Sequence, residues 1–142
     1  MIRDTFFITL FFVLVGVAVL YILDSFFFFL LSSKIWWYDV VTHFGGGFWA
    51  GGLVLWGYTY INKTSHTENS RTSLLLLSIL AALTIGILWE LYEVILLPTL
   101  SSAPDYVFDT TTDLIADVCG ASLAGFYFFY IRTHTVFSHK QE

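Results

Sequence analysis

Charge is scarce in this sequence. Of its 142 residues, 12% are charged and 57% are hydrophobic, whereas roughly a quarter of the residues in a soluble domain are charged. A water-soluble core does not account for that composition. Six residues are Lys or Arg, and the formal net charge is −5. This argues against nucleic acid as a partner and against a polybasic anchor on lipid headgroups.

Cysteine and proline are nearly absent as well. The one cysteine, Cys119, lies in an apolar stretch, which excludes a disulfide framework and a cysteine-based zinc cluster. The two prolines, Pro98 and Pro104, fall in one short segment, and Pro98 ends the apolar run before it because proline cannot continue a helix. Almost nothing remains for a soluble module, so the sequence predicts a single integral membrane domain over residues 1–142.

Long apolar runs dominate what is there. A hydrocarbon core of about 30 Å needs about 20 helical residues, and several runs reach that length. We therefore predict an all-α polytopic membrane protein, a four-transmembrane-helix bundle in the cell membrane, with helices at about 5–31, 38–61, 73–97 and 109–131. Glycines in the 38–61 run and small residues in the 109–131 run favour close helix packing and suggest a homo-oligomer among membrane lipids.

The distribution of cations predicts the orientation of the bundle. Four spans place both termini on one side of the membrane, and five of the six cations fall on that side too. The positive-inside rule then predicts that both termini face the cytoplasm. The cations on the inner side are Arg3, Lys63, Arg71, Arg132 and Lys140, and Lys34 is on the outer side.

The acidic residues gather toward the opposite, outer side. His43 and the acids on the three later helices lie at a similar depth, about 6 to 12 Å from the outer helix ends at 1.5 Å per residue. Within each helix they are spaced three or four residues apart and so share one face. Eight of the eleven acids are on this side: Asp24, Asp39, Glu90, Glu93, Asp105, Asp109, Asp113 and Asp117.

Crowded carboxylates in a low-dielectric layer need a partner. Lipid-facing carboxylates cost roughly 2.5 to 3.5 kcal/mol each, so these faces should point into the bundle. Basic side chains are nearly absent there, which leaves a metal ion or protons. The donors suit Mg²⁺, Mn²⁺, Fe²⁺ or Zn²⁺. The predicted metal ligands are His43, Glu90, Glu93, Asp113 and Asp117, and the predicted catalytic carboxylates are Asp117 and Asp39.

Simpler interpretations stay open for several of these residues. Asp39 and Asp109 fall at predicted helix starts and could act only as N-caps. Asp24 could be the solvated end of the first helix. A histidine on an apolar face is more often a hydrogen-bonded core residue than a ligand, but His43 has Asp39 one turn before it. Whether Asp24, Asp39 and Asp109 belong to the site is left open.

Three hypotheses for function follow from the acidic layer. The first is a metal-dependent hydrolase or transferase that acts on a lipid or lipid-linked substrate at the outer leaflet. The second is a cation or proton transporter, or a relay subunit, that uses the same carboxylates. The third is a structural accessory protein whose acidic layer only holds the bundle together.

Short motifs on the three later helices resemble a known group of proteins. They are similar to the YjdF-like small bacterial membrane proteins of unknown function and, more distantly, to the VanZ-like proteins, whose pattern has Asn at the position of Asp117. The resemblance implies a membrane domain of four or more helices with an acidic and histidine site, and no established reaction. The motifs are Tyr38-Asp39-x-x-x-His43-Phe44, Trp89-Glu90-x-x-Glu93 and Asp109-x-x-x-Asp113-x-x-x-Asp117-x-x-Gly120-Ala121.

Overall fold

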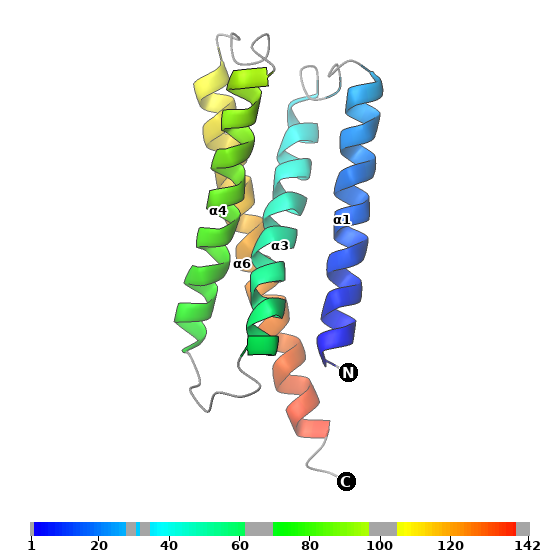
Figure 1. Cartoon of the computed structure of the whole chain (residues 1–142), viewed down its shortest axis with the longest axis vertical. Coiled ribbons are helices and arrows are strands. Elements are labelled where there is room, and N and C mark those ends of the chain that lie inside the picture. The colour runs from blue at the N-terminus through cyan, green and yellow to red at the C-terminus, as the bar shows by residue number, and fades with distance from the viewer. Residues whose placement is uncertain (1, 28–30, 32–34, 62–69, 97–104, 139–142) are drawn as a thin grey trace.

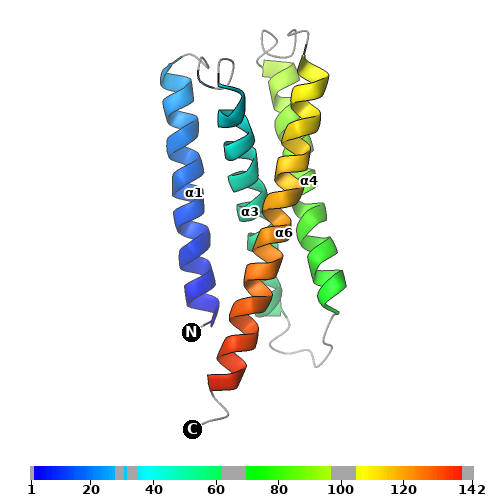
Figure 2. The same cartoon turned by 180° about the vertical axis from the view of Figure 1, so that it is seen from behind.

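The protein is an elongated bundle of helices. The computed structural model describes residues 2–27, 31, 35–61, 70–96 and 105–138, and these contain the helices α1 (Ile2–Phe26), α3 (Trp36–Ile61), α4 (Arg71–Leu96) and α6 (Tyr106–Ser138). Both termini lie at the same end (Figure 1), as the view from behind also shows (Figure 2). The predicted all-α bundle is confirmed.

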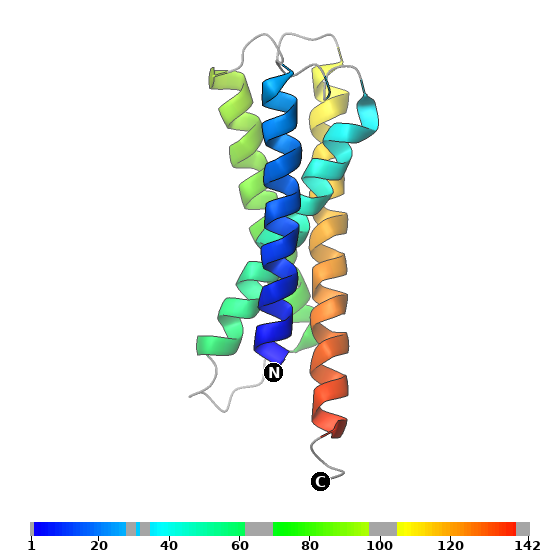
Figure 3. The ribbon, with the colours of Figure 1, turned by 90° about the vertical axis from the view of Figure 1, so that its right-hand side faces the viewer.

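The helix α3 is the central one in the bundle. Helices α1, α4 and α6 are each long and apolar enough to cross a membrane, and α3 is not among these three. It packs against every other helix and crosses behind α1 in Figure 3. A helix surrounded by protein need not be apolar all round, because its polar groups can face partners instead of lipid. This explains why α3 can carry glycines, Asp39 and His43 in its outer half.

Several helix ends differ from the sequence-based boundaries, most of all the end of the last helix, which continues to Ser138 and not to Ile131. The first helix ends at Phe26 and not at Leu31, and Asp24 Oδ1 accepts the Leu31 N–H at 2.9 Å. The last helix begins at Tyr106 and not at Asp109. The Asp105 carbonyl accepts the N–H groups of Phe108 and Asp109 at 2.9 and 3.0 Å, which puts Asp105 at the helix start.

The interior divides into an apolar half and a polar half. The half nearest the termini is filled by an apolar core of Phe6, Leu10, Phe48, Leu55, Leu74, Ala124 and Phe128. The other half contains most of the buried polar side chains: Asp24, His43, Glu90, Asp113 and Asp117. The acidic residues of the predicted layer are therefore gathered at one end of the bundle.

The described arginines lie at the end that carries the termini. Arg71 begins α4, its guanidinium lies 5.9 Å from the ring centroid of Phe129, and Arg132 is near the end of α6. Lys34, Lys63 and Lys140 lie outside the described residues. The arginines and the acids thus occupy opposite ends, and the orientation of the bundle in the membrane stays a prediction.

One hydrogen bond fastens α1 to α3 at the acidic end. The buried Tyr38 hydroxyl donates to the Leu20 carbonyl at 2.6 Å. Tyr38→Phe is expected to lower the free energy of unfolding by about 1 kcal/mol, because it removes one buried hydrogen bond and keeps the ring. Unfolding in mixed detergent micelles measures this difference, and an unchanged transition would contradict it.

Candidate functional site

Three side chains of the predicted layer meet between α3 and α6. Each of Asp39, His43 and Asp113 offers one ligand atom within 4.8 Å of the others. His43 Nε2 lies 3.8 Å from Asp39 Oδ1, and Asp39 also accepts a hydrogen bond from Thr42 at 3.3 Å. Asp39 is inside the first turn of α3, so it is not the N-cap that the sequence left open. Its side chain faces His43 one turn later.

Asp117 supports the same histidine from the other side of the ring. Its Oδ2 lies 3.5 Å from His43 Nδ1, a long hydrogen bond. A carboxylate accepts, so Nδ1 donates in this contact, and Nε2 faces Asp39. A carboxylate on the second ring nitrogen is the usual way in which proteins orient a metal-binding histidine.

Glycines from three helices make room for Asp117. A Cβ atom at Gly47 of α3 would collide with the Asp117 backbone, and one at Gly86 of α4 would collide with its carboxylate. Gly120, one turn further along α6, lies against the Phe44 carbonyl of α3. The close approach of these backbones depends on the missing side chains. These contacts lie within one chain, and the homo-oligomer stays a prediction.

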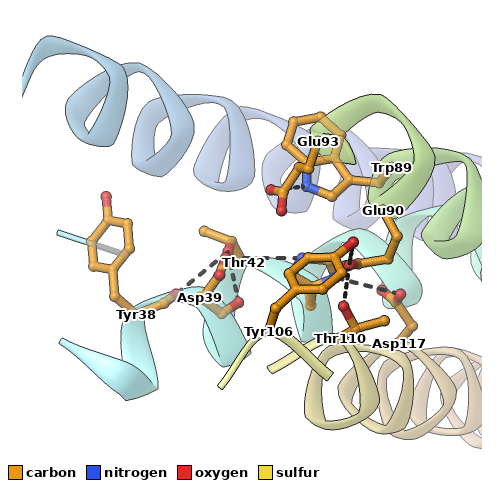
Figure 4. A network of polar contacts seen from close by, with 10 residues as sticks. Tyr38, Asp39, Thr42, Trp89, Glu90, Glu93, Tyr106, Thr110 and Asp117 are labelled. Carbon is orange, nitrogen blue, oxygen red and sulfur yellow. Dashed lines mark hydrogen bonds and ion pairs between the residues drawn. The ribbon is translucent and has the colours of Figure 1, made fainter. Parts of the chain in front are cut away.

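Glu90 reaches the cluster from α4. Its Oε2 accepts hydrogen bonds from Thr110 at 2.6 Å and from Tyr106 at 3.4 Å. Figure 4 shows these contacts beside the Asp117 carboxylate. Hydroxyl groups of α6 therefore hold one oxygen of Glu90 and leave the other free. We call Asp39, His43, Glu90, Asp113 and Asp117 the acidic cluster.

Two oxygens of the acidic cluster are buried without a hydrogen-bond donor. Among the described residues, Asp113 Oδ1 and Glu90 Oε1 have no partner, and their residues are 3% and 8% exposed. An unsatisfied buried carboxylate oxygen is costly, more so than a neutral polar group. These two oxygens therefore need a cation or protons, and they are separate from the carboxylates that already contact His43.

The remaining predicted acids occupy other positions. Glu93 accepts a hydrogen bond from the Trp89 indole N–H at 2.9 Å and is not in the group that Asp39, His43 and Asp113 form. Asp109 is exposed and lies within the first turn of α6, past the cap. Asp24 is buried, and its Oδ1 accepts the Leu31 N–H.

The sequence-based hypothesis missed three residues of this site. Tyr106 and Thr110 hold Glu90, and Gly86 faces the Asp117 carboxylate. A signal for two of them is present, because Tyr106 and Thr110 precede Asp113 by seven and three residues and so fall on its helix face. No comparable pattern marks Gly86, since its role depends on contact between α4 and α6.

The fold and this arrangement define a small helical membrane bundle with a buried acidic and histidine cluster. The chain belongs to the DUF2238 family, described as predicted membrane proteins, which matches residues 4–134. No curated protein and no solved structure matches it. The family supports the membrane location, whereas the likeness to YjdF-like and VanZ-like proteins stays a prediction.

Proposed function

We propose that Asp39, His43 and Asp113 bind a divalent cation near the outer end of the bundle. The observation that carries this proposal is the buried Asp113 Oδ1, which has no donor and belongs to the residue group whose ligand atoms lie within 4.8 Å of one another. Two carboxylates and an imidazole suit Mg²⁺, Mn²⁺, Fe²⁺ or Zn²⁺. Three protein donors leave coordination positions for water or substrate, as in catalytic sites.

The location of the acidic cluster favours a lipid or lipid-linked substrate. His43 is seven residues from the start of α3, which is a depth of about 10 Å. That depth is close to the headgroup region of the outer leaflet. We propose a metal-dependent hydrolase or transferase, in which the bound cation would polarise a phosphoryl or acyl oxygen or activate water.

The side chains around the cation would then have distinct roles. Asp117 holds His43 through Nδ1 and so acts as a positioning residue. Asp39 belongs to the ligand group, which leaves Glu90 as the carboxylate available for proton transfer. Thr110 fixes one oxygen of Glu90, and the second oxygen is free to accept a proton from water. The general base, predicted from sequence as Asp117 or Asp39, is therefore proposed to be Glu90.

The apolar half of the bundle disfavours the alternative that the protein is a cation or proton transporter or a relay subunit. A proton or cation path would have to cross the layer of Phe6, Leu10, Leu55, Leu74 and Phe128. Polar contacts of the described residues near that layer include Thr9 with Tyr127 and Ser78 with the Ala121 carbonyl. A buried cluster that this layer separates from one end of the bundle suits an enzyme better than a transporter.

The substitution Glu90→Gln distinguishes the proposed enzyme from the alternative of a structural accessory protein. In nanodiscs reloaded with Mn²⁺, headgroup release from phospholipid is expected to fall by about 100-fold or more, the usual effect of losing a general base. Mn²⁺ affinity should change only a few-fold, because Glu90 is outside the ligand group. Mass spectrometry of released headgroups and calorimetric titration of Mn²⁺ measure the two effects.

Asp109→Asn is the matched control for that experiment. Asp109 is exposed at the same end of the bundle, so turnover should equal that of the wild type. Wild-type protein that binds Mn²⁺ and releases no headgroup or acyl chain from any phospholipid would contradict the enzyme. Release that persists in chelator would contradict its dependence on metal.

A further inference from the structure

Three aromatic rings form a corner between α1 and α4 at the acidic end. The ring centroids of Tyr21 and Trp89 are 5.3 Å apart with planes at 82°, and those of Trp89 and Tyr92 are 5.3 Å apart at 34°. The Tyr21 ring of α1 therefore stands nearly perpendicular to the Trp89 ring of α4.

A carboxylate lies at the edge of this corner. Glu93 Oε1 accepts the Trp89 indole N–H at 2.9 Å, and Figure 4 shows the carboxylate against the indole ring. No lysine or arginine pairs with Glu93 in the described part of the chain. Arg71 begins the same helix 22 residues earlier, about 33 Å away along the axis. We call Tyr21, Trp89, Tyr92 and Glu93 the aromatic corner.

The aromatic corner has the chemistry that attracts an organic cation. The faces of tyrosine and tryptophan rings carry negative electrostatic potential and bind ammonium groups, quaternary ones included. Glu93 adds a carboxylate that pairs with no lysine or arginine among the described residues. All four residues are half-buried, so the corner is partly desolvated and still reachable from the headgroup region.

We infer that the aromatic corner binds the ammonium group of a zwitterionic phospholipid headgroup. The inference rests on the proposed function, whose lipid substrate it specifies. Glu90 and Glu93 are one turn apart on α4; Glu90 faces the hydroxyl groups of α6, and Glu93 lies with Trp89 and the α1 ring of Tyr21. One headgroup can then place its ammonium in the corner and its phosphate toward the acidic cluster.

This arrangement also gives Glu93 a role apart from metal binding. The sequence predicts Glu93 as a metal ligand, one turn after Glu90. Its contact with Trp89 and its place outside the Asp39, His43 and Asp113 group favour ammonium recognition instead. The two glutamates would therefore select different parts of the same headgroup.

Headgroup preference tests the inference directly. Purified protein is placed in phosphatidylglycerol nanodiscs that contain a trace of phosphatidylethanolamine or phosphatidylcholine, and bound lipid is counted by native mass spectrometry. The wild type is expected to retain the ammonium lipids over phosphatidylglycerol. Trp89→Leu and Glu93→Gln should each reduce that preference about tenfold, as expected for loss of a desolvated cation–π or charge contact.

Matched variants separate recognition from folding. Trp37→Leu removes a 53% exposed tryptophan from the same end of the bundle and should leave the preference unchanged. Tyr21→Phe keeps the ring and should retain most of it. Equal retention of all three lipids by the wild type, or full preference in both Trp89→Leu and Glu93→Gln, would overturn the inference.

A comparison of the two ammonium lipids and a titration with Mn²⁺ identify the main contact and show which proposal fails. Preference for phosphatidylcholine indicates ring faces as the main contact, and preference for phosphatidylethanolamine indicates Glu93; either supports an ammonium site. Mn²⁺ affinity of the same samples shows which proposal fails. Mn²⁺ binding without ammonium preference overturns this inference alone, whereas ammonium preference without Mn²⁺ binding supports it and overturns the metal site.

Discussion

Gly47→Ala is expected to lower the free energy of unfolding by about 3 kcal/mol, at the upper end of the usual cost of overpacking. The added Cβ would collide with the carbonyl oxygen, Cα and carbonyl carbon of Asp117. These are backbone atoms, so no rotation of a side chain relieves the contact. The helices α3 and α6 would have to separate at the position that holds Asp117 against His43.

Gly46→Ala is the matched control for that substitution. Nothing lies within 4 Å of a Cβ atom at Gly46, and alanine is favoured over glycine in a helix by about 0.5 to 1 kcal/mol. The two neighbouring variants should therefore shift stability in opposite directions. Unfolding in mixed detergent micelles measures both, and equal transitions for the two would contradict the close contact between α3 and α6.

Asp113→Asn is expected to raise the free energy of unfolding when no metal is present and to lower it when metal is bound, each relative to the wild type. Asparagine has nearly the same shape and lacks the charge, so the metal-free variant should be more stable than the metal-free wild type, which buries an unpaired carboxylate. With metal, the order should reverse, because the variant lacks one ligand. We expect Mn²⁺ or Zn²⁺ affinity to fall by more than about 100-fold, beyond the usual loss for an outer-shell partner.

Thermal unfolding with and without saturating Mn²⁺ shows the reversal. Metal that binds only the folded state raises its stability by RT ln(1 + [L]/Kd), about 2.7 kcal/mol at a hundredfold excess over Kd. Asp109→Asn, an exposed carboxylate one turn earlier on α6, should follow the wild type in both conditions. A wild-type transition that Mn²⁺, Mg²⁺, Fe²⁺ and Zn²⁺ all leave unmoved would contradict the metal site.

The helices and the depth of the acidic layer could be predicted from sequence. Apolar run length gives the number of helices, because the bilayer fixes the length of a span. Helical rise puts His43, Glu90 and Asp113 at one depth without knowledge of the packing. The helix ends were harder to predict, since the last helix continues to Ser138, well past the apolar run.

The partners of each acid could not be predicted from spacing. Glu90 and Glu93 share a face by their separation of three, yet Glu90 contacts Thr110 and Glu93 contacts Trp89. A helix face is wide enough to meet two neighbours, and only the packing of α4 against α3 and α6 decides which. The same holds for Gly86, whose use depends on the Asp117 carboxylate opposite it.

The apolar core of the half nearest the termini forms a hydrophobic barrier between the acidic cluster and that end of the bundle. Phe6, Leu55, Leu74 and Phe128 are at most 2% exposed, so an ion at the acidic cluster would exchange through the opposite end. If the arginine-bearing end faces the cytoplasm, as the positive-inside rule predicts, that ion would be supplied by the extracellular or periplasmic fluid, independently of cytoplasmic metal homeostasis.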